Sequence, residues 1–221
     1  MAKNPEKNPG RKRSRLYFED LFGYFPFLKG IGDLLSIFPP TLVSIASFAS
    51  ALLAGITLFL APSFLILTSF FLLLNLFFDS VDGYIARKTR RVSKIGDFLD
   101  HVLDRFSDIV IFLCLTYSPY VDHEYLGLFA LISILLLSYI GTQGKAIGME
   151  REFISPANRV NRMYILILAP LVELLLQISN IKHAFLKFTF FDLLMGIFII
   201  LAVLSTIIRI KMIVKKAGEN A

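Results

Sequence analysis

Cysteine and charge are both scarce in this 221-residue sequence. Cys114 is the single cysteine, so the chain cannot form an internal disulfide and has no CxxC pair that could bind a metal. The residue lies inside an apolar run, where a thiol usually packs as a small hydrophobic side chain. A metal bound by this chain must therefore use oxygen ligands.

Only 18% of the residues are charged, whereas 56% are hydrophobic. This composition is too apolar for a soluble domain with one core, and the sequence shows neither a separate soluble domain nor an internal repeat. It predicts one all-α integral membrane domain. The net charge of +6 raises the question of nucleic acid, but the basic residues flank apolar segments and are not interleaved with exposed aromatic residues. We therefore expect anionic lipid headgroups as the partner, and no nucleic acid.

The N-terminal part lacks the apolar core of a secretory signal peptide. Residues 1–15 combine basic residues with two prolines, which is typical of a disordered basic arm on a membrane face. Residues 16–38 are predicted to form a juxtamembrane amphipathic segment. Within it, Leu16 to Lys29 mixes aromatic residues with Glu19 and Asp20. This pattern indicates an interfacial amphipathic helix, although a short helix facing the solvent explains it equally well.

Residues 39–221 contain six apolar segments, each near the about 20 residues that cross a membrane as a helix. We expect six transmembrane helices at Pro40–Leu60, Ser63–Ala86, Gly96–Tyr117, Tyr125–Lys145, Asn158–Ser179 and Phe188–Ile213. The fold class predicted from the sequence is thus an all-α membrane protein with six transmembrane helices and an N-terminal interfacial helix.

Basic residues alternate between the loops that join these helices. The segment from Arg87 to Lys94 contains five of them, and the segment from Gly144 to Arg162 contains four, whereas Ala61-Pro62 and Ser118 to Glu124 contain no lysine or arginine. Because loops rich in lysine and arginine stay in the cytoplasm, we expect both termini and the loops after the second and fourth helices to be cytoplasmic. Lys182, His183 and Lys187, in the predicted outer loop before the last helix, are the exception.

Four acidic residues lie toward the cytoplasmic ends of the second and third predicted helices. Asp79 and Asp82 are spaced i and i+3, and Asp100 and Asp104 are spaced i and i+4, so each pair shares one helix face. The short turn between the helices predicts that all four carboxylates meet. Two Mg²⁺ or Mn²⁺ ions would neutralise them, since both ions prefer oxygen ligands. Alternatively, the acids form an ion-pair network with Arg87, Lys88, Arg90, Arg91 and Arg105.

Other polar residues near this stretch are assigned less specific roles. Asp97 and Asp108 lie off the face shared by Asp100 and Asp104, so we expect them to support the site or to lie at the surface. His101 should point about 100° away from both acids and serve packing or the surface. For Glu173, in the fifth helix, a place in the cavity and a place between subunits both remain open.

The spacing around the acids resembles the signature of a known family. It reads Asp79-x2-Asp82-Gly83-x2-Ala86-Arg87-x8-Gly96-x3-Asp100-x3-Asp104, which is similar, position for position, to the motif of the CDP-alcohol phosphotransferases, membrane enzymes of phospholipid biosynthesis. The resemblance implies six transmembrane helices, a cavity open to the cytoplasm, two divalent metal ions and a homodimer.

The resemblance also implies roles for individual residues. Asp79, Asp82 and Asp100 would bind metal, and Asp104 would bind metal and act as the general base. Asp82, Gly83, Ala86 and Arg87 would hold the CDP group. Family members often carry Pro-Asn and a following Thr at the start of the first transmembrane helix, whereas this chain reads Pro39-Pro40-Thr41-Leu42-Val43-Ser44. Thr41 and Ser44 are the hydroxyls that remain for contacts with CDP.

The predicted reaction transfers a phosphatidyl-type group from a CDP-lipid to a polar alcohol. The acceptor hydroxyl attacks the β-phosphorus, Asp104 takes the proton, and CMP leaves. The lipid donor is CDP-diacylglycerol or CDP-archaeol, and the sequence favours neither.

Cations near the fourth and fifth helices bear on the acceptor. Ser138, Tyr139, Lys145, Arg159 and Arg162 form a pattern that resembles the phosphatidylinositol-phosphate and archaetidylinositol-phosphate synthases. We therefore expect inositol phosphate as acceptor, with its phosphate on Lys145, Arg159 and Arg162. Glycerol phosphate, serine or another alcohol remains an alternative. It also remains open that these cations serve only topology and lipid headgroups.

Two other functions also use acidic residues in a membrane. A prenyltransferase binds a diphosphate through aspartates, but this sequence has one contiguous aspartate cluster and no second motif in the later helices. A cation transporter would place acids near the middle of the membrane, whereas these lie toward the cytoplasmic helix ends. Production of CMP from a CDP-lipid separates the predicted transferase from both alternatives.

Overall fold

The structure of the protein is a computed structural model that describes residues 26–90, 93–147, 157–180 and 187–219. Its elements, in chain order, are α2 (Pro26–Leu35), α3 (Pro40–Thr57), the 3₁₀ helix η1 (Pro62–Phe64), α4 (Leu65–Lys88), α5 (Lys94–Thr116), α6 (Glu124–Ala146), α7 (Arg159–Ile178) and α8 (Phe190–Glu219). The described part is thus helical, as the sequence predicts. The predicted basic arm, residues 1–15, lies outside the described residues.

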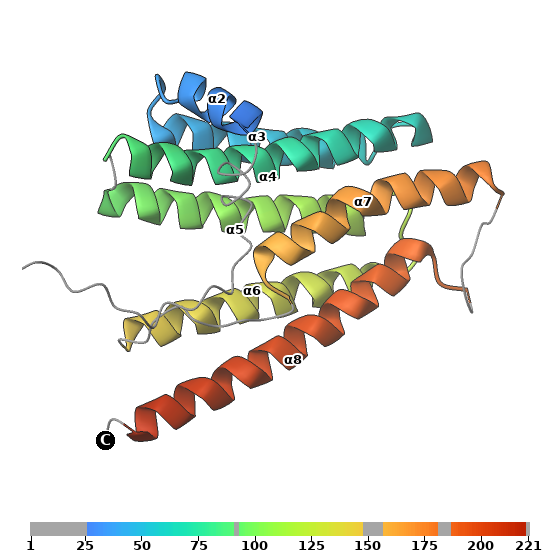
Figure 1. The fold of residues 1–221 in the computed structure, drawn as a ribbon. Helices are drawn as coiled ribbons and strands as arrows, with labels where there is room; N and C mark the ends of the chain where they lie inside the picture. The colour runs from blue at the N-terminus through green and yellow to red at the C-terminus, as the bar shows by residue number, and fades with distance from the viewer. Residues whose placement is uncertain (1–25, 91–92, 148–156, 181–186, 220–221) are drawn as a thin grey trace, which may run out of the picture.

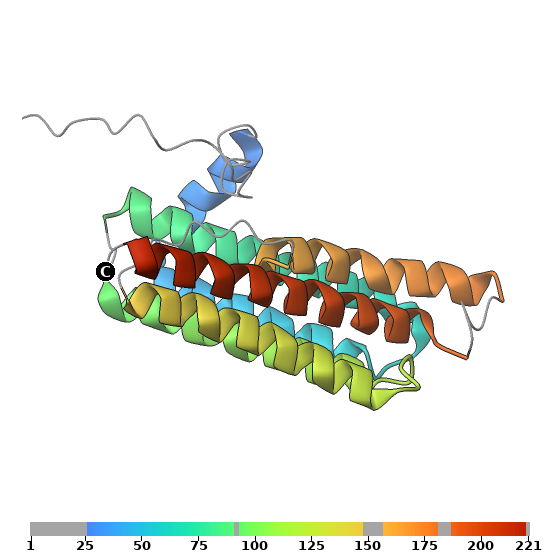
Figure 2. The same ribbon diagram turned by 90° about the horizontal axis from the view of Figure 1, so that it is seen from below.

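The six long helices form one elongated bundle (Figures 1 and 2). The helix α3 packs against both α4 and α5, α4 also packs against α7, and α6 packs between α5 and α8. The end of α4, the start of α5 and the ends of α6 and α8 gather at one end of the bundle, whereas α7 begins partway along it (Figure 1). Two segments far apart in sequence, α4 and the start of α7, are therefore brought together.

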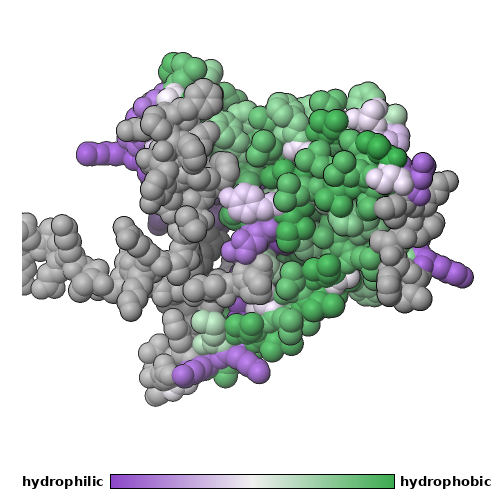
Figure 3. Space-filling view, turned by 45° about the vertical axis from the view of Figure 1, so that its right-hand side comes forward, coloured by the Kyte–Doolittle hydropathy of each residue, from purple (hydrophilic) through white to green (hydrophobic). Residues whose placement is uncertain are grey.

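Five of the long helices are long and apolar enough to cross a membrane: α3, α4 together with η1, α6, α7 and α8. The predicted third transmembrane helix also forms, as α5, but acidic residues throughout its first half keep it out of this group. Large apolar side chains such as Ile56, Phe70 and Ile200 are exposed, and the surface over the helices is broadly apolar (Figure 3). Such a surface is typical of a multi-pass membrane protein.

Side-chain caps mark where α5 and α7 begin. At α5, the Ser93 hydroxyl accepts a hydrogen bond from the Gly96 amide at 2.9 Å. At α7, Asn158 Oδ1 accepts one from the Asn161 amide at 2.8 Å. Each cap satisfies an amide that the first helical turn leaves unpaired. The caps therefore define the register of Asp100, Asp104 and Arg159 relative to the helix starts.

Polar contacts hold α3 to α4 along the seam that leads to the acids. Asn75 donates through Nδ2 to the Ser47 carbonyl at 2.9 Å, and the Ser47 hydroxyl donates to the Asn75 carbonyl at 2.9 Å. Both residues are buried. Interhelical hydrogen bonds of this kind stabilise helix pairs where the surrounding lipid provides no hydrophobic driving force. The pairing sets the rotation of α4, and with it the face that carries Asp79 and Asp82.

The short helix α2 lies outside the bundle against α4 (Figure 2). Its Asp33 Oδ1 accepts hydrogen bonds from the Tyr84 hydroxyl and from Lys88 Nζ, both at 2.6 Å. Part of the predicted amphipathic segment, residues 16–38, is thus helical and tied to the basic end of α4. Residues 16–25 lie outside the described part, so most of the helix expected over Leu16 to Lys29 is not tested.

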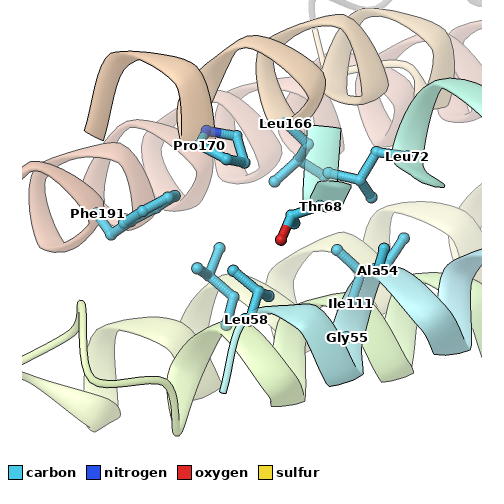
Figure 4. A pocket seen from close by; sticks show the side chains of 10 residues that line it. Ala54, Gly55, Leu58, Thr68, Leu72, Ile111, Leu166, Pro170 and Phe191 are labelled. Atoms are coloured by element: carbon cyan, nitrogen blue, oxygen red, sulfur yellow. The ribbon is translucent and has the colours of Figure 1, made fainter. Parts of the chain in front are cut away.

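A small cavity lies between the helices (Figure 4), and none of the four motif aspartates lines it. Apolar groups from α3, α4, α5, α7 and α8 line it, and its one side-chain hydroxyl, that of Thr68, lies 2.8 Å from Thr57 Oγ1. Glu173, elsewhere on α7, is half-buried and accepts a hydrogen bond from Gln177 at 2.9 Å. The cavity lining therefore contains no charged group that could bind a diphosphate, and the acids are the candidate for the functional site.

Replacing Gly127 on α6 by alanine is expected to lower the stability of the protein by about 1–3 kcal/mol, the usual cost of overpacking. A Cβ at this position would collide with Thr116 Oγ1 and lie 2.8 Å from Thr116 Cβ, and the Thr116 hydroxyl is held by the Phe112 carbonyl at 2.6 Å. Thermal unfolding in detergent measures the change. The matched control is Gly196→Ala, where nothing lies within 4 Å of an added Cβ. Equal unfolding temperatures for the two variants would contradict the packing described.

Candidate metal and substrate site

The four aspartates of the motif interact with one another across α4 and α5. One nitrogen of Arg159 contacts both Asp79 on α4 and Asp104 on α5, and ligand atoms of Asp104 and Asp100 lie within 4.8 Å of one another. Asp82 is close enough to Asp79 and Asp100 for their charges to interact. They meet beside α3, because α4 and α5 both pack on this helix. The structure thus brings together the acids that the sequence predicts to meet. Such a concentration of negative charge needs cations close by.

Asp82 is the most buried of the four motif aspartates, with 6% of the residue exposed. The Ser44 hydroxyl donates a hydrogen bond to Asp82 Oδ2 at 2.6 Å. Ser44, on α3, thus orients a carboxylate of the neighbouring helix α4, and its contact with CDP stays a prediction. Thr41 lies one turn earlier on α3 and is partly exposed.

Asp100, His101 and Asp104 form a group whose potential ligand atoms all lie within 4.8 Å of one another. The His101 Nδ1 atom lies 3.7 Å from Asp100 Oδ2, and its Nε2 atom lies 3.6 Å from Asp97 Oδ1. The prediction that His101 points away from both acids is therefore wrong. The 100° step along a helix sets the direction of Cβ, but the side-chain rotamer then carries the ring back toward its neighbours.

The donor atoms of this cluster fit a divalent cation. Carboxylate oxygens are the ligands that Mg²⁺ and Mn²⁺ prefer, and four carboxylates from two helices interact at one place. Asp79, Asp82, Asp100 and Asp104 are thus the residues that would hold such ions, and His101 provides a further nitrogen beside them.

Arg159, the first residue of α7, reaches into the acid cluster. Its Nη1 atom lies 2.6 Å from Asp79 Oδ1 and 2.8 Å from Asp104 Oδ1. Its side chain is 13% exposed, so these ion pairs are only weakly screened by solvent. The residue predicted to bind the acceptor phosphate is therefore adjacent to the proposed metal ligands.

Arg162 and Asp108 form a second, more deeply buried ion pair between α7 and α5. Arg162 donates through Nη2 to Asp108 Oδ2 at 2.9 Å and through Nη1 to the Ala157 carbonyl at 2.8 Å. Arg105 donates to the same Asp108 oxygen at 2.8 Å. With side-chain exposures of 5% and 2%, Arg162 and Asp108 anchor the start of α7. Of the two roles predicted for Asp108, the surface position is thus excluded.

The remaining predicted residues lie near the ends of α4 and α6, which gather at one end of the bundle. Gly83 and Ala86 are partly buried on α4, and Arg87 is exposed one residue further on. Lys145 is exposed at the end of α6. The three cations predicted for the acceptor thus differ in setting: Arg159 at the acids, Arg162 in a buried pair, and Lys145 at the surface.

Arg209 is a further candidate functional residue that is not among those predicted from the sequence. It lies on α8 and donates through Nη1 to the Leu137 carbonyl of α6 at 2.8 Å. The same nitrogen occupies the space beside Gly141, where a Cβ would lie only 2.8 Å away. Lys145 follows Gly141 by one helical turn. The signal was present in the sequence, because an arginine inside an apolar membrane segment is costly and usually marks a functional site.

Comparisons with known proteins bear on this site. The sequence profile of the CDP-alcohol phosphatidyltransferase family matches residues 37–215. An archaetidylinositol phosphate synthase of Pyrococcus horikoshii is 33% identical over 132 residues, which cover 60% of this chain and 69% of that protein.

Solved structures share the fold. The phosphatidylinositol phosphate synthase of Mycobacterium tuberculosis with CDP-DAG bound matches with a TM-score of 0.65 at 21% identity, covering 86% of this chain and 94% of that one. The structure of that enzyme in complex with manganese and citrate matches with a TM-score of 0.64 at 22% identity, covering 85% and 87% of the two chains.

Proposed function

Because the chain belongs to the CDP-alcohol phosphatidyltransferase family, we propose that its aspartate cluster transfers a phosphatidyl-type group from a CDP-lipid to a polar alcohol and releases CMP. The observation that carries this proposal is the meeting of the motif aspartates across α4 and α5, where one Arg159 nitrogen contacts both Asp79 and Asp104 and where Asp104 lies within one group with Asp100. The donor is CDP-diacylglycerol or CDP-archaeol. A relative named archaetidylinositol phosphate synthase supports the archaeol donor, and a related structure with CDP-DAG bound supports the diacylglycerol donor.

We infer that two divalent cations, Mg²⁺ or Mn²⁺, bind the four aspartates. The oxygen donors fit such ions, and a related enzyme has been solved in complex with manganese. When bound, the cations would neutralise charge on the diphosphate of the donor. Cation binding would also explain why these carboxylates lie inside a membrane protein, because charged residues there are costly and usually bind a cation or a substrate.

The side chains of the protein perform the remaining steps of the proposed mechanism. The oxygen of the acceptor hydroxyl attacks the β-phosphorus while Asp104 takes the hydroxyl proton, and CMP leaves with the bridging oxygen. Arg87 binds phosphate oxygens of CDP. Gly83 and Ala86 leave room for the nucleotide to approach the backbone of α4, and Thr41 offers it a hydroxyl. Ser44 orients Asp82 through the hydrogen bond described above.

We propose inositol phosphate as the acceptor. Relatives named archaetidylinositol phosphate synthase and phosphatidylinositol phosphate synthase support this choice, and Lys145, Arg159 and Arg162 supply positive charge for a phosphate. Arg159 and Lys145 would contact it, and Arg162 would hold α7 in place through Asp108. Glycerol phosphate, serine or another alcohol is the alternative, with the same chemistry.

An acceptor screen tests this choice. Purified protein with Mg²⁺ and a CDP-lipid is supplied in turn with inositol phosphate, glycerol phosphate, serine and free inositol, and CMP release is measured. We expect the highest rate with inositol phosphate and little release with the uncharged acceptors. Equal rates with charged and uncharged acceptors would refute a phosphate-binding role for the cations.

Replacing Lys145 by glutamine is expected to raise the KM for inositol phosphate by about tenfold or more, because a charge-assisted hydrogen bond to the phosphate is lost. The KM for the CDP-lipid should change little. Initial rates of CMP release at varied acceptor concentration measure both constants. Lys211→Gln, at an exposed lysine of α8, is the control. An unchanged acceptor KM in the Lys145 variant would argue that this lysine serves topology alone.

We propose the following arrangement in the membrane. All six long helices cross it, including α5, whose acidic face is turned toward the other helices and the site. Both termini and the site face the cytoplasm, since basic residues follow α4 and α6 and end α8. The protein acts as a homodimer, as the family resemblance implies. The helix α2 lies at the membrane surface beside the entrance to the site.

A further inference from the structure

Arg159 contacts two of the carboxylates that the proposed function assigns to metal ions. One nitrogen, Nη1, bridges Asp79 Oδ1 at 2.6 Å and Asp104 Oδ1 at 2.8 Å. The Asp79 and Asp104 side chains are 20% and 16% exposed, so the guanidinium offsets much of the repulsion between them. Arg159 therefore joins α7 to both acid-bearing helices, α4 and α5.

Arg162, one turn further along α7, provides an internal comparison. Its partners are Asp108 and the Ala157 carbonyl, and neither of them belongs to the proposed metal ligands. A cation that binds the four aspartates would leave the Arg162 contacts intact, whereas Arg159 already holds one oxygen of each of two proposed ligands, Asp79 and Asp104. Of these two arginines, only Arg159 would thus compete with a cation for the aspartates.

The position of Arg159 also leaves one of its own donors unsatisfied. Its Nε atom is buried and has no hydrogen-bond partner among the described residues. Buried donors normally find a partner, so an unpaired one needs an explanation. A phosphate accepts hydrogen bonds from both sides of a guanidinium fork, including Nε, and would satisfy this donor.

We propose that Arg159 is a positioning residue with two alternative partners: it neutralises Asp79 and Asp104 until a divalent cation binds, and it then turns to the phosphate of the acceptor. The proposal rests on the proposed function, since it assumes a cation at the aspartates. In this scheme the cation site is available only in the fraction of molecules in which Arg159 has left the carboxylates, so Arg159 lowers the apparent affinity for the cation. By reciprocity, a phosphate bound to Arg159 raises that affinity.

The direct test is a titration of the purified full-length protein in detergent micelles with Mn²⁺ alone, with free Mn²⁺ measured by electron paramagnetic resonance. Arg159→Gln is expected to bind Mn²⁺ at least about tenfold more tightly than the wild type. Arg105→Gln is the matched control, because it removes a guanidinium 3.8 Å from Asp104 Oδ2 whose shorter contact is with Asp108. This control should change the affinity by no more than about threefold.

A second variant guards against misfolding of Arg159→Gln. Arg159→Lys keeps the positive charge but reaches less far and lacks the fork, so its Mn²⁺ affinity should lie between those of the wild type and the glutamine variant. Equal or weaker affinity in both Arg159 variants, or no binding of Mn²⁺ by any of the proteins, would overturn the proposal. The readout does not depend on transfer. A wild type that binds Mn²⁺ but releases no CMP would refute the proposed function and leave the result on Arg159 standing.

Discussion

Asp104→Asn is expected to lower the rate of CMP release by at least about a thousandfold. The amide cannot take the proton of the acceptor hydroxyl, and removal of a general base alone typically costs a factor of 10²–10⁴. It is also a weaker ligand for Mg²⁺ or Mn²⁺ than a carboxylate. The rate is measured with purified protein, CDP-lipid and inositol phosphate under conditions in which the wild type is saturated.

Asp97→Asn is the matched control for this experiment. Asp97 lies on the same helix as Asp104, but its side chain is 66% exposed, so its variant should stay within about threefold of the wild-type rate. Thermal unfolding shows whether each variant remains folded. A folded Asp104→Asn protein with a rate within a few-fold of the wild type would show that another group takes the proton.

Removal of divalent cations is expected to abolish CMP release. Four interacting carboxylates repel a diphosphate unless cations lie between them and the substrate. Treatment with a chelator should therefore reduce the rate to background, and addition of Mg²⁺ or Mn²⁺ should restore it. Potassium chloride at matched ionic strength is the control, because it screens charge without binding specifically. Full activity after exhaustive chelation would remove the metal ions from the mechanism.

The helices and the meeting of the four aspartates could be predicted from the sequence because both depend on local patterns. Long apolar runs fix where α3, α4, α6, α7 and α8 lie, and the spacing of Asp79, Asp82, Asp100 and Asp104 places each pair on one helix face. The short turn between α4 and α5 then brings the two pairs together. For α5, the same charges that indicate a site lower the hydropathy, so composition alone does not identify it as a membrane helix.

Contacts between distant segments could not be predicted in the same way. Arg162 and Asp108 are 54 residues apart, and their pairing depends on α7 beginning partway along the bundle. Nothing in the sequence near either residue specifies this position. From the sequence, Arg159 and Arg162 are therefore expected to be equivalent cations, whereas the structure places Arg159 at the aspartates and Arg162 in a buried pair. The position of His101 was missed for a different reason, since helix geometry does not determine a rotamer.

The most direct test of the reaction is to follow the β-phosphorus of the donor. CDP-diacylglycerol carrying ³²P at the phosphorus next to the lipid is incubated with purified protein, Mg²⁺ and inositol phosphate, and the products are separated into lipid and water-soluble fractions. The proposed mechanism predicts that the label appears in a new phospholipid that contains the acceptor, with unlabelled CMP released in equal amount. Label in the water-soluble fraction, or no CMP release with any acceptor, would contradict transfer of the phosphatidyl group by this protein.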